Sequence, residues 1–321
     1  MRKIFILLAL SILAAPAFYG CRRPAGEEAS WVVVKDQLPI ADPFILLHDG
    51  VYYAYGTGED GFGVYSSDDL EHWRHRGIAL DTGKSWGSHW FWAPEVYYIK
   101  SQKKFFLFYS AEEHICVATA DSPLGPFTQS EVKPIRDEQG IDTSLFIDDD
   151  GKAYLFFVRF TGGNVVWVAE MTPDLLGIKE ETLTECISVG EPWETIQAKV
   201  AEGPSVFKRK GTYYLLYSAN DYRSKDYAVG YATASSPFGP WTKYTGNPIL
   251  RRDLPNGKGL VGTGHGAPFK SKDGKMMYVF HAHQNDTVVH PRITLINKEL
   301  RISRDGTLSM PGEVLHPVVV E

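Results

Sequence analysis

Three acidic residues, Asp42, Asp142 and Glu202, stand at the same place in a segment that recurs along the chain. Each copy begins with the acid, runs through small and apolar residues to a charged turn containing glycine, and continues into an aromatic-rich stretch. A fourth copy carries His265 where the others carry the acid. The turn glycine follows that residue by nine positions in three copies and by eight in the copy of Asp42. Repeats of this kind bring equivalent side chains to one point, so we expect a pocket lined by carboxylates there.

Carboxylates crowded into a partly desolvated pocket do not all titrate alike. Burial and a neighbouring negative charge raise the pKa of one carboxyl while another stays ionised, which separates a proton donor from a base. Hydrolysis of a glycosidic bond needs such a pair, because one group protonates the leaving oxygen while the other activates water or attacks the sugar. The structural alternative is that the acids cap turns, as Asp-Pro pairs such as Asp42-Pro43 commonly do. Glu202 fits that alternative poorly, since glutamate is not a turn residue.

The elements that position these residues are predicted to be short strands. Apolar and aromatic runs alternate with turn clusters, which is typical of hairpins in an all-β protein. Together with the segment at 90–110, five similar segments start near residues 41, 92, 141, 201 and 264. Their spacing of about 50 to 60 residues predicts a five-bladed β-propeller with four-stranded antiparallel blades around a central axis. We expect residues 38–321 to form this single domain.

A second repeated motif has a structural role in this prediction. The sequence Ser-Pro-Leu-Gly-Pro-Phe ends at Phe127, and Ser-Pro-Phe-Gly-Pro-Trp ends at Trp241. Proline and glycine here favour a turn, and we expect the aromatic residue after it to wedge between blades. In the first blade, the stretch that ends at Trp73 is expected to have the same structural role.

In a propeller the first strand of each blade lines the axis and begins at one mouth. Asp42, Asp142, Glu202 and His265 are therefore predicted to meet in one pocket. Trp92 aligns with Glu202, because the prolines at 94 and 204 follow at the same interval. An indole at the mouth would serve as a stacking platform for a sugar ring.

The composition limits the classes of partner. The 44% apolar and 22% charged residues are those of an ordinary globular protein, and the net charge of −6 offers no basic surface for nucleic acid. The chain has 17 Tyr and 8 Trp, which suit the edges of clefts for polar, ring-shaped ligands.

Cys116 and Cys186 are expected to be buried thiols. His281 and His283 share a strand face but lack a third ligand, so we expect them to line or support the pocket and not to bind zinc.

Residues 1–21 are predicted to be an export signal. Arg2 and Lys3 precede an apolar run that is too short to cross a bilayer permanently. Cys21 directly after it indicates a bacterial lipoprotein, with cleavage after Ala17 as the alternative. Residues 22–37 would then form a polar tether, and the protein would lie in the periplasm or at the cell surface, held to the membrane only by a lipid on Cys21.

The sequences ADP (residues 41–43), WAPE (92–95), IDTSLF (141–146) and AEGP (201–204) together resemble glycoside hydrolase family 43. The resemblance covers the whole chain after the signal. It implies a five-bladed β-propeller that hydrolyses glycosides with inversion, in a family of β-xylosidases, α-L-arabinofuranosidases, arabinanases and some galactosidases. By this resemblance Asp42 would be the general base, Glu202 the general acid, and Asp142 the residue that orients Glu202 and modulates its pKa. Inverting pairs hold their carboxyl groups roughly 6.5–9.5 Å apart to admit a water molecule.

The resemblance also implies substrate-binding roles for Trp92, His265 and Arg292. His265 would lie under the sugar, beside a water molecule or a calcium ion; the alternative is a polar histidine satisfied within the channel. Arg292 would grip vicinal hydroxyls with its planar fork, and the alternative is a surface arginine. No cofactor is expected to be required, and an axial calcium near His265 is left open.

These patterns predict an exported, monomeric glycosidase that removes arabinose or xylose from the ends of plant cell-wall polysaccharides. A galactosidase of the same fold is the alternative within enzymes. A non-catalytic carbohydrate-binding propeller on the cell surface is the alternative from another class. Such a binder would need the aromatic residues but not three intact acids.

Overall fold

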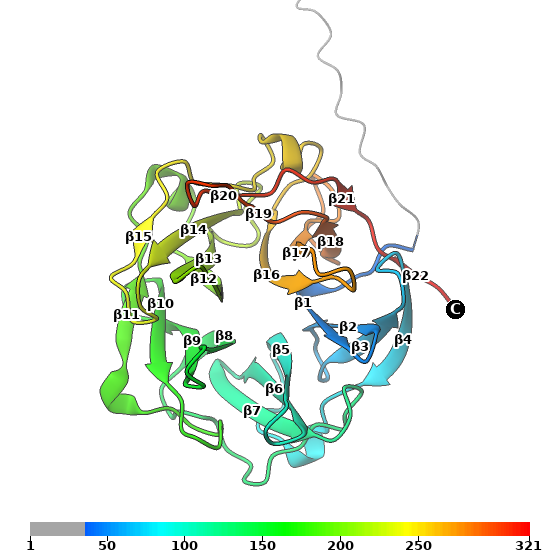
Figure 1. Cartoon of the computed structure of the whole chain (residues 1–321). Coiled ribbons are helices and arrows are strands. Elements are labelled where there is room, and N and C mark those ends of the chain that lie inside the picture. The colour runs from blue at the N-terminus through cyan, green and yellow to red at the C-terminus, as the bar shows by residue number, and fades with distance from the viewer. Residues whose placement is uncertain (1–35) are drawn as a thin grey trace, which may run out of the picture. The chain divides into compact units, whose positions relative to one another are not determined.

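The predicted hairpins form five antiparallel sheets arranged around a central axis (Figure 1), so the expected five-bladed β-propeller is confirmed. The computed structural model describes residues 36–321, which fall in one compact unit. The export signal, Cys21 and residues 22–35 of the predicted tether lie outside the described residues. None of the helices in the described part is long and apolar enough to cross a membrane.

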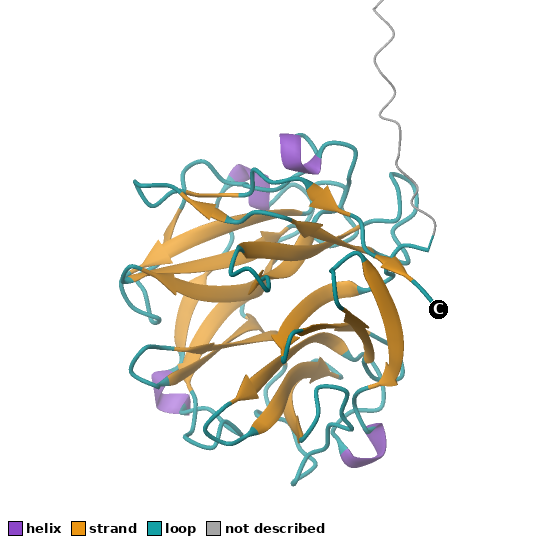
Figure 2. Cartoon of the chain, turned by 45° about the vertical axis from the view of Figure 1, so that its right-hand side comes forward, coloured by secondary structure: helices purple, strands orange, loops and turns teal. Residues whose placement is uncertain are grey.

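Strands make up the body of each blade, and the few helices are single turns in the connecting loops (Figure 2). The first blade holds β1 (Ala41–His48), β2 (Val51–Thr57), β3 (Gly63–Ser67) and β4 (His72–Ile78); the second β5 (Trp92–Ile99), β6 (Lys104–Ala111) and β7 (His114–Ala120); the third β8 (Gly140–Ile147), β9 (Ala153–Phe160), β10 (Asn164–Glu170) and β11 (Thr184–Ile187). The fourth holds β12 (Ala201–Arg209), β13 (Thr212–Ala219), β14 (Ala228–Ala234) and β15 (Thr242–Lys243); the fifth β16 (Gly264–Lys270), β17 (Met276–Ala282), β18 (Ile293–Asn297) and β21 (Val314–Leu315). The loops carry η1 (Thr82–Lys84), η2 (Glu180–Thr182), η3 (Pro192–Glu194), η4 (Pro255–Gly257) and a hairpin of β19 (Arg301–Ile302) and β20 (Leu308–Ser309).

The blades depart from four strands at two places. β22 (Val318–Val319) runs parallel to β4 and makes the first sheet five-stranded, which ties the C-terminal end of the propeller to its first blade. The second sheet has only three strands. Beside β7 the chain makes isolated contacts instead, at Thr128 and Ile135. Prolines at 126 and 134 flank these contacts, and proline cannot donate to a strand ladder.

The repeated motif after the third strand does place an aromatic residue between blades. Phe127 is fully buried in a cluster that joins the first and second blades. Trp241 packs edge-on against Phe156 of the third blade, and Trp73 is fully buried against residues of the fifth. Apolar contacts of this kind hold the blades together.

The innermost strand of every blade is interrupted at the same position. The ladder to the second strand skips two residues, between Glu202 and Ser205 in β12 and likewise in β1, β5, β8 and β16. The first skipped residue has a positive φ in all five blades: 51° at Asp42, 46° at Ala93, 59° at Asp142, 56° at Gly203 and 40° at His265. These five residues are therefore the structural equivalents of one another.

This register corrects the alignment drawn from the sequence. Asp42, Asp142 and His265 are equivalent as predicted, but Glu202 lies one position earlier, in register with Trp92. The turn glycines misled the alignment because the hairpin turns differ in length. Gly151 and Gly274 lie in five-residue turns, whereas Gly211 lies in a two-residue turn, like Gly50 of the first blade. The equivalent of Asp142 eight residues before Gly211 is Gly203.

Candidate active site

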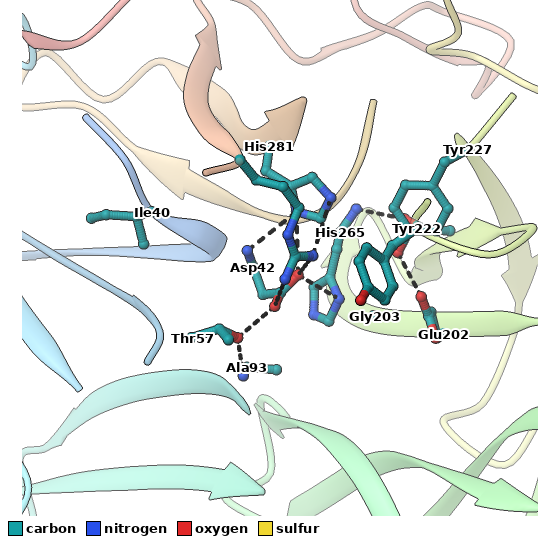
Figure 3. Close-up of polar contacts among 12 residues, drawn as sticks. Ile40, Asp42, Thr57, Ala93, Glu202, Gly203, Tyr222, Tyr227, His265 and His281 are labelled. Atoms are coloured by element: carbon teal, nitrogen blue, oxygen red, sulfur yellow. Dashed lines mark hydrogen bonds and ion pairs between the residues drawn. The ribbon is translucent and has the colours of Figure 1, made fainter. Parts of the chain in front are cut away.

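The six predicted site residues line one pocket at the axis, with a volume of about 310 Å³. Five of them lie at the starts of the innermost strands, and Arg292 immediately precedes β18. Figure 3 shows Asp42, His265 and Glu202 converging from three blades. A larger hollow of about 460 Å³ lies at the edge of the second blade, but its charged side chains are exposed and it gathers no buried acids. The axial pocket lined by Asp42, Trp92, Asp142, Glu202, His265 and Arg292 is therefore the candidate site.

The backbone at the positive-φ position is held by the neighbouring blade. In four blades its N–H group donates to a side chain on the second strand of the preceding blade. The pairs are Asp42 to His281 Nδ1 (3.2 Å), Ala93 to Thr57 Oγ1 (3.0 Å), Asp142 to Ser110 Oγ (3.0 Å) and His265 to Ser218 Oγ (2.8 Å). This ring of contacts fixes the start of each innermost strand, and with it the side chains that face the pocket.

The ring is broken at the fourth blade, where the equivalent side chain is Val158, which cannot accept a hydrogen bond. The N–H group of Gly203 donates instead to Oδ2 of Asp142, at 3.1 Å. Asp142 thus holds the residue that directly follows Glu202. This contact gives Asp142 a positioning role that the repeat pattern alone did not reveal.

Asp42 is surrounded by nitrogen donors and is only 8% exposed. Arg292 donates to both carboxylate oxygens, at 2.8 and 3.2 Å, and Thr57 donates its hydroxyl to Oδ2. His265 Nδ1 lies 3.4 Å from Oδ1. Burial acts to raise the pKa of Asp42, but Arg292 and His265 outweigh it and hold that pKa well below its usual range. Asp42 is therefore ionised at neutral pH.

Glu202 has an environment of the opposite kind. Tyr227 donates its hydroxyl to Oε1 and the amide of Asn164 donates to Oε2, both at 2.9 Å. No cationic side chain forms an ion pair with it within the described residues. Burial, followed by the negative charge of Asp142, raises the pKa of Glu202 to about 8. Glu202 therefore carries a proton at neutral pH.

The pKa of Asp142 lies between the pKa values of Asp42 and Glu202. Burial and the charge of Asp42 raise its pKa to about 7. His265 Nδ1 is 3.9 Å from its Oδ2 and also contacts Asp42, so the histidine bridges two acids of the pocket. The pocket thus contains an ionised carboxylate, a protonated carboxyl and a third acid that couples to both.

Arg292 is buried, contrary to the surface alternative, and its guanidinium lies 4.6 Å above the ring of Tyr222. Its Nε is buried without a partner among the described residues. His281 is fully buried, and burial lowers its pKa to about 3, so it is neutral and can accept the N–H of Asp42. His281 thus supports the pocket as expected.

Two residues that contact Glu202 could not be recognised from the sequence. Tyr227 is one of 17 tyrosines, and Asn164 is the first residue of β10. Glu95, below the pocket, was also missed as a chemical group. Tyr97 donates its hydroxyl to Glu95, and burial raises the pKa of Glu95 to about 8.

A calcium ion near His265, which the sequence leaves open, would have a limited donor set. Calcium takes six to eight oxygen ligands. Residues 36–321 contain no group of three or more His, Cys, Asp or Glu side chains arranged to hold a metal. The axial calcium remains a prediction.

Comparisons with known proteins agree with this geometry. The family model described as glycosyl hydrolases family 43 matches residues 33–308. A β-D-galactofuranosidase of Aspergillus niger is 29% identical over 80% of this chain and 78% of its own, and a β-xylosidase of Xylanibacter ruminicola is 29% identical over 67% and 81%. Among solved structures, an endo-1,4-β-xylanase from Bacteroides thetaiotaomicron is 55% identical, with a TM-score of 0.86 over 89% of this chain and 99% of that one. A thermostable family-43 glycoside hydrolase is 37% identical, with a TM-score of 0.79 over 87% and 95%. The chain belongs to glycosyl hydrolases family 43.

Proposed function

We propose that the protein is an inverting glycoside hydrolase that releases xylose or arabinose from xylan or arabinoxylan. The observation that carries the proposal is the contrast between two buried carboxyls in one pocket: Asp42 pairs with Arg292, whereas Glu202 accepts hydrogen bonds from the neutral donors Tyr227 and Asn164. Asp42 is held ionised by Arg292, and Glu202 is kept protonated by burial. Hydrolysis with inversion needs this pair at neutral pH.

Asp42 acts as the general base in this proposal. It takes a proton from a water molecule as the water oxygen bonds to the anomeric carbon. On the opposite side of the sugar, Glu202 gives its proton to the glycosidic oxygen as the bond to the anomeric carbon breaks. Asp42 ends protonated and Glu202 ionised, and exchange with water restores both groups. Inversion follows because the water enters opposite to the leaving group.

The remaining pocket residues position these two. Asp142 anchors Gly203 beside Glu202 and raises the pKa of Glu202 by its charge. His265 and Trp92 line the sugar site, and Arg292 is placed to bind sugar hydroxyls as well as Asp42. No step of this mechanism requires a cofactor.

The sugar is proposed from the relatives. A β-xylosidase and an arabinoxylan arabinofuranohydrolase of Bacillus subtilis are both 29% identical to this chain. A galactosidase is the second candidate, favoured by the β-D-galactofuranosidase among the relatives. The 55% identical neighbour is described as an endo-1,4-β-xylanase, which makes cleavage within chains the alternative to removal of terminal sugars. The small pocket supports removal of terminal sugars.

The test is a screen of the purified protein against aryl xylosides, arabinofuranosides and galactosides, with xylan and arabinoxylan beside them. Release of monosaccharide from the polymers supports removal of terminal sugars, whereas release of oligosaccharides supports internal cleavage. Proton NMR of the first product reports its anomeric configuration, and retention would refute the proposed mechanism. Asp42→Ala and Glu202→Ala should each abolish turnover while leaving the thermal unfolding midpoint nearly unchanged. Binding of these glycans without release of any product would favour the non-catalytic alternative.

We also propose that the protein is exported and tethered through a lipid on Cys21. The support is the basic, apolar and small-residue order of residues 1–21. Cys21→Ser should leave the protein in the soluble fraction of its native cell type, whereas the wild type should partition with membranes. Equal partition of both would refute the tether.

A further inference from the structure

Trp90 is a large apolar side chain exposed at the edge of the pocket. Its exposed fraction is 52%, although the residue after it, Phe91, is buried in the core between the first two blades. The indole of Trp90 lies against that of Trp92, with ring centroids 5.8 Å apart and planes 16° apart. Trp92 itself lines the pocket. The two indoles therefore form an offset stack that leads from the pocket to its outside.

The loop that carries Trp90 is fixed on both sides. The N–H group of Gly58 donates to the carbonyl of Phe91 at 3.0 Å. On the other side, the N–H and hydroxyl of Ser88 both donate to Glu112 at 2.8 Å. The ring of His89 lies 3.4 Å from the same carboxylate. The position of the exposed indole is thus set by contacts with the first and second blades.

The backbone of Trp90 has a φ of 58°, in the left-handed region that bulky residues rarely adopt. Such a conformation is strained and persists where the surroundings impose it, often at ligand sites. A glycine or asparagine would adopt this φ more readily. Among the exposed large hydrophobic residues of the described part, Trp90 alone combines solvent exposure with a left-handed backbone.

We propose that Trp90 forms a binding site for a second sugar ring, belonging to the glycan chain from which the terminal sugar is cleaved. This inference rests on the proposed function, because it assumes that the cleaved sugar occupies the pocket. A sugar ring in its chair form presents C–H groups on its faces and hydroxyls on its rim, which matches the flat apolar face and wet edge of an exposed indole. The offset between Trp92 and Trp90 places this second site beside the pocket, next to the sugar that Trp92 would hold.

The site predicts a preference for chains over small leaving groups. Binding of the second ring would add affinity for a xylo-oligosaccharide and none for free xylose. An aryl group is smaller than a sugar chain and would gain less from Trp90. The loss of affinity or activity on replacing Trp90 should therefore grow with the length of the substrate. A general defect of the pocket would not depend on substrate length in this way.

The first experiment measures binding in the Glu202→Gln background by calorimetry, with xylotetraose and xylose as probes. Trp90→Gly should weaken xylotetraose binding about tenfold and leave xylose binding unchanged. Glycine accepts the left-handed backbone, so the loop should keep its shape and the thermal unfolding midpoint should stay within a few degrees. Trp90→Phe should recover part of the affinity. Val132→Ala, at a side chain that is 56% exposed and outside the pocket, is the control and should bind both probes like the parent.

The second experiment compares kcat/KM for the aryl glycoside that the wild type cleaves and for an oligosaccharide that carries the same terminal sugar. Trp90→Gly should lower the second value about tenfold more than the first. Equal losses on both substrates, or equal xylotetraose affinity in Trp90→Gly and its parent, would refute the second sugar site while leaving the proposed function intact. A wild type that neither cleaves these substrates nor binds xylotetraose would refute the proposed function itself.

Discussion

Replacing Asp142 with asparagine should shift the alkaline limb of the pH–activity profile to lower pH. The amide oxygen of asparagine can still accept the N–H of Gly203, which Asp142 Oδ2 accepts at 3.1 Å. The substitution therefore removes the negative charge and keeps the contact that positions Glu202. That charge is the second cause, after burial, of the raised pKa of Glu202.

The size of the shift follows from the pKa of Glu202. A pKa of about 8 against an ordinary 4.5 means that ionising this carboxyl in the pocket costs roughly 5 kcal/mol more than in water. Burial accounts for the larger part. A neighbouring like charge contributes about one pH unit or more, which corresponds to ~1.4 kcal/mol. Since a negative neighbour disfavours the ionised form, its removal must lower the pKa of Glu202, and the alkaline limb should fall from near pH 8 by about one unit.

The assay is kcat/KM as a function of pH, because the pH dependence of this ratio reports the pKa values of the acid and base in the free enzyme. Asp142→Ala separates the two roles of the residue, since it also removes the acceptor for Gly203. It should show the same shift of the limb together with a further loss of about tenfold or more in kcat. Asp174→Asn, the same chemical change on the outside of the third blade, is the control and should leave the limb where it is.

Two results would refute this reasoning. If the alkaline limb of Asp142→Asn stayed in place or moved upward, the charge of Asp142 would not be what keeps Glu202 protonated. If Asp142→Asn lost as much activity on aryl substrates with good leaving groups as on those with poor ones, the defect would not lie in proton donation.

Three further predictions concern the other groups around the two acids. Tyr227→Phe removes a hydrogen bond that lowers the pKa of Glu202, so the alkaline limb should move upward, opposite to Asp142→Asn; a downward shift would contradict this. Arg292→Lys removes the bidentate pair that keeps the pKa of Asp42 low, so the acid limb should move to higher pH and KM should rise about tenfold; an unchanged acid limb would count against Asp42 as the base. Glu95 has a folded-state pKa of about 8, raised above its ordinary 4.5, so its contribution to stability is complete below pH 4.5 and is lost as the pH rises to about 8. Across this range Glu95→Gln should therefore reduce the slope at which the unfolding free energy falls with pH, by at most about 1.4 kcal/mol per pH unit. Denaturant unfolding at a series of pH values measures this slope. Parallel curves of unfolding free energy against pH for the variant and the wild type would refute the assignment.

Much of the fold could be predicted from the sequence because a propeller repeats. Five copies of one hairpin pattern gave the number of blades, and the position of the first strand at the axis brought distant acids together. The repeat also placed Trp92 in register with Glu202, and the strand pairing confirms this register. The three-stranded second blade was not predicted, because the chain beside β7 runs on past the repeated motif that ends at Phe127 and pairs there only at isolated positions.

The contacts around each acid could not be predicted in the same way. Tyr227 reaches Glu202 from β13's following loop, and Asn164 reaches it from the neighbouring blade. Such partners depend on loop paths and blade spacing, which leave no periodic signal. Arg292 could be proposed for the pocket only through the family resemblance, and its bidentate contact with Asp42 required the coordinates.

The register of the fourth blade gives Glu202 surroundings that differ from those of Asp42. Asp42 occupies the positive-φ position, where its carboxylate meets Arg292 and His265 near the axis. Glu202 lies one residue before that position, which Gly203 takes, and its carboxyl meets the neutral donors Tyr227 and Asn164 instead. A carboxyl paired with an arginine loses its proton, and one among neutral donors in a buried site keeps it. Asp142 shares the positive-φ position of Asp42 without pairing with Arg292, and burial and the charge of Asp42 raise its pKa to about 7. The pairing of Asp42 with Arg292, together with the one-residue offset of Glu202 that the turn lengths concealed in the sequence, therefore accounts for the division of roles.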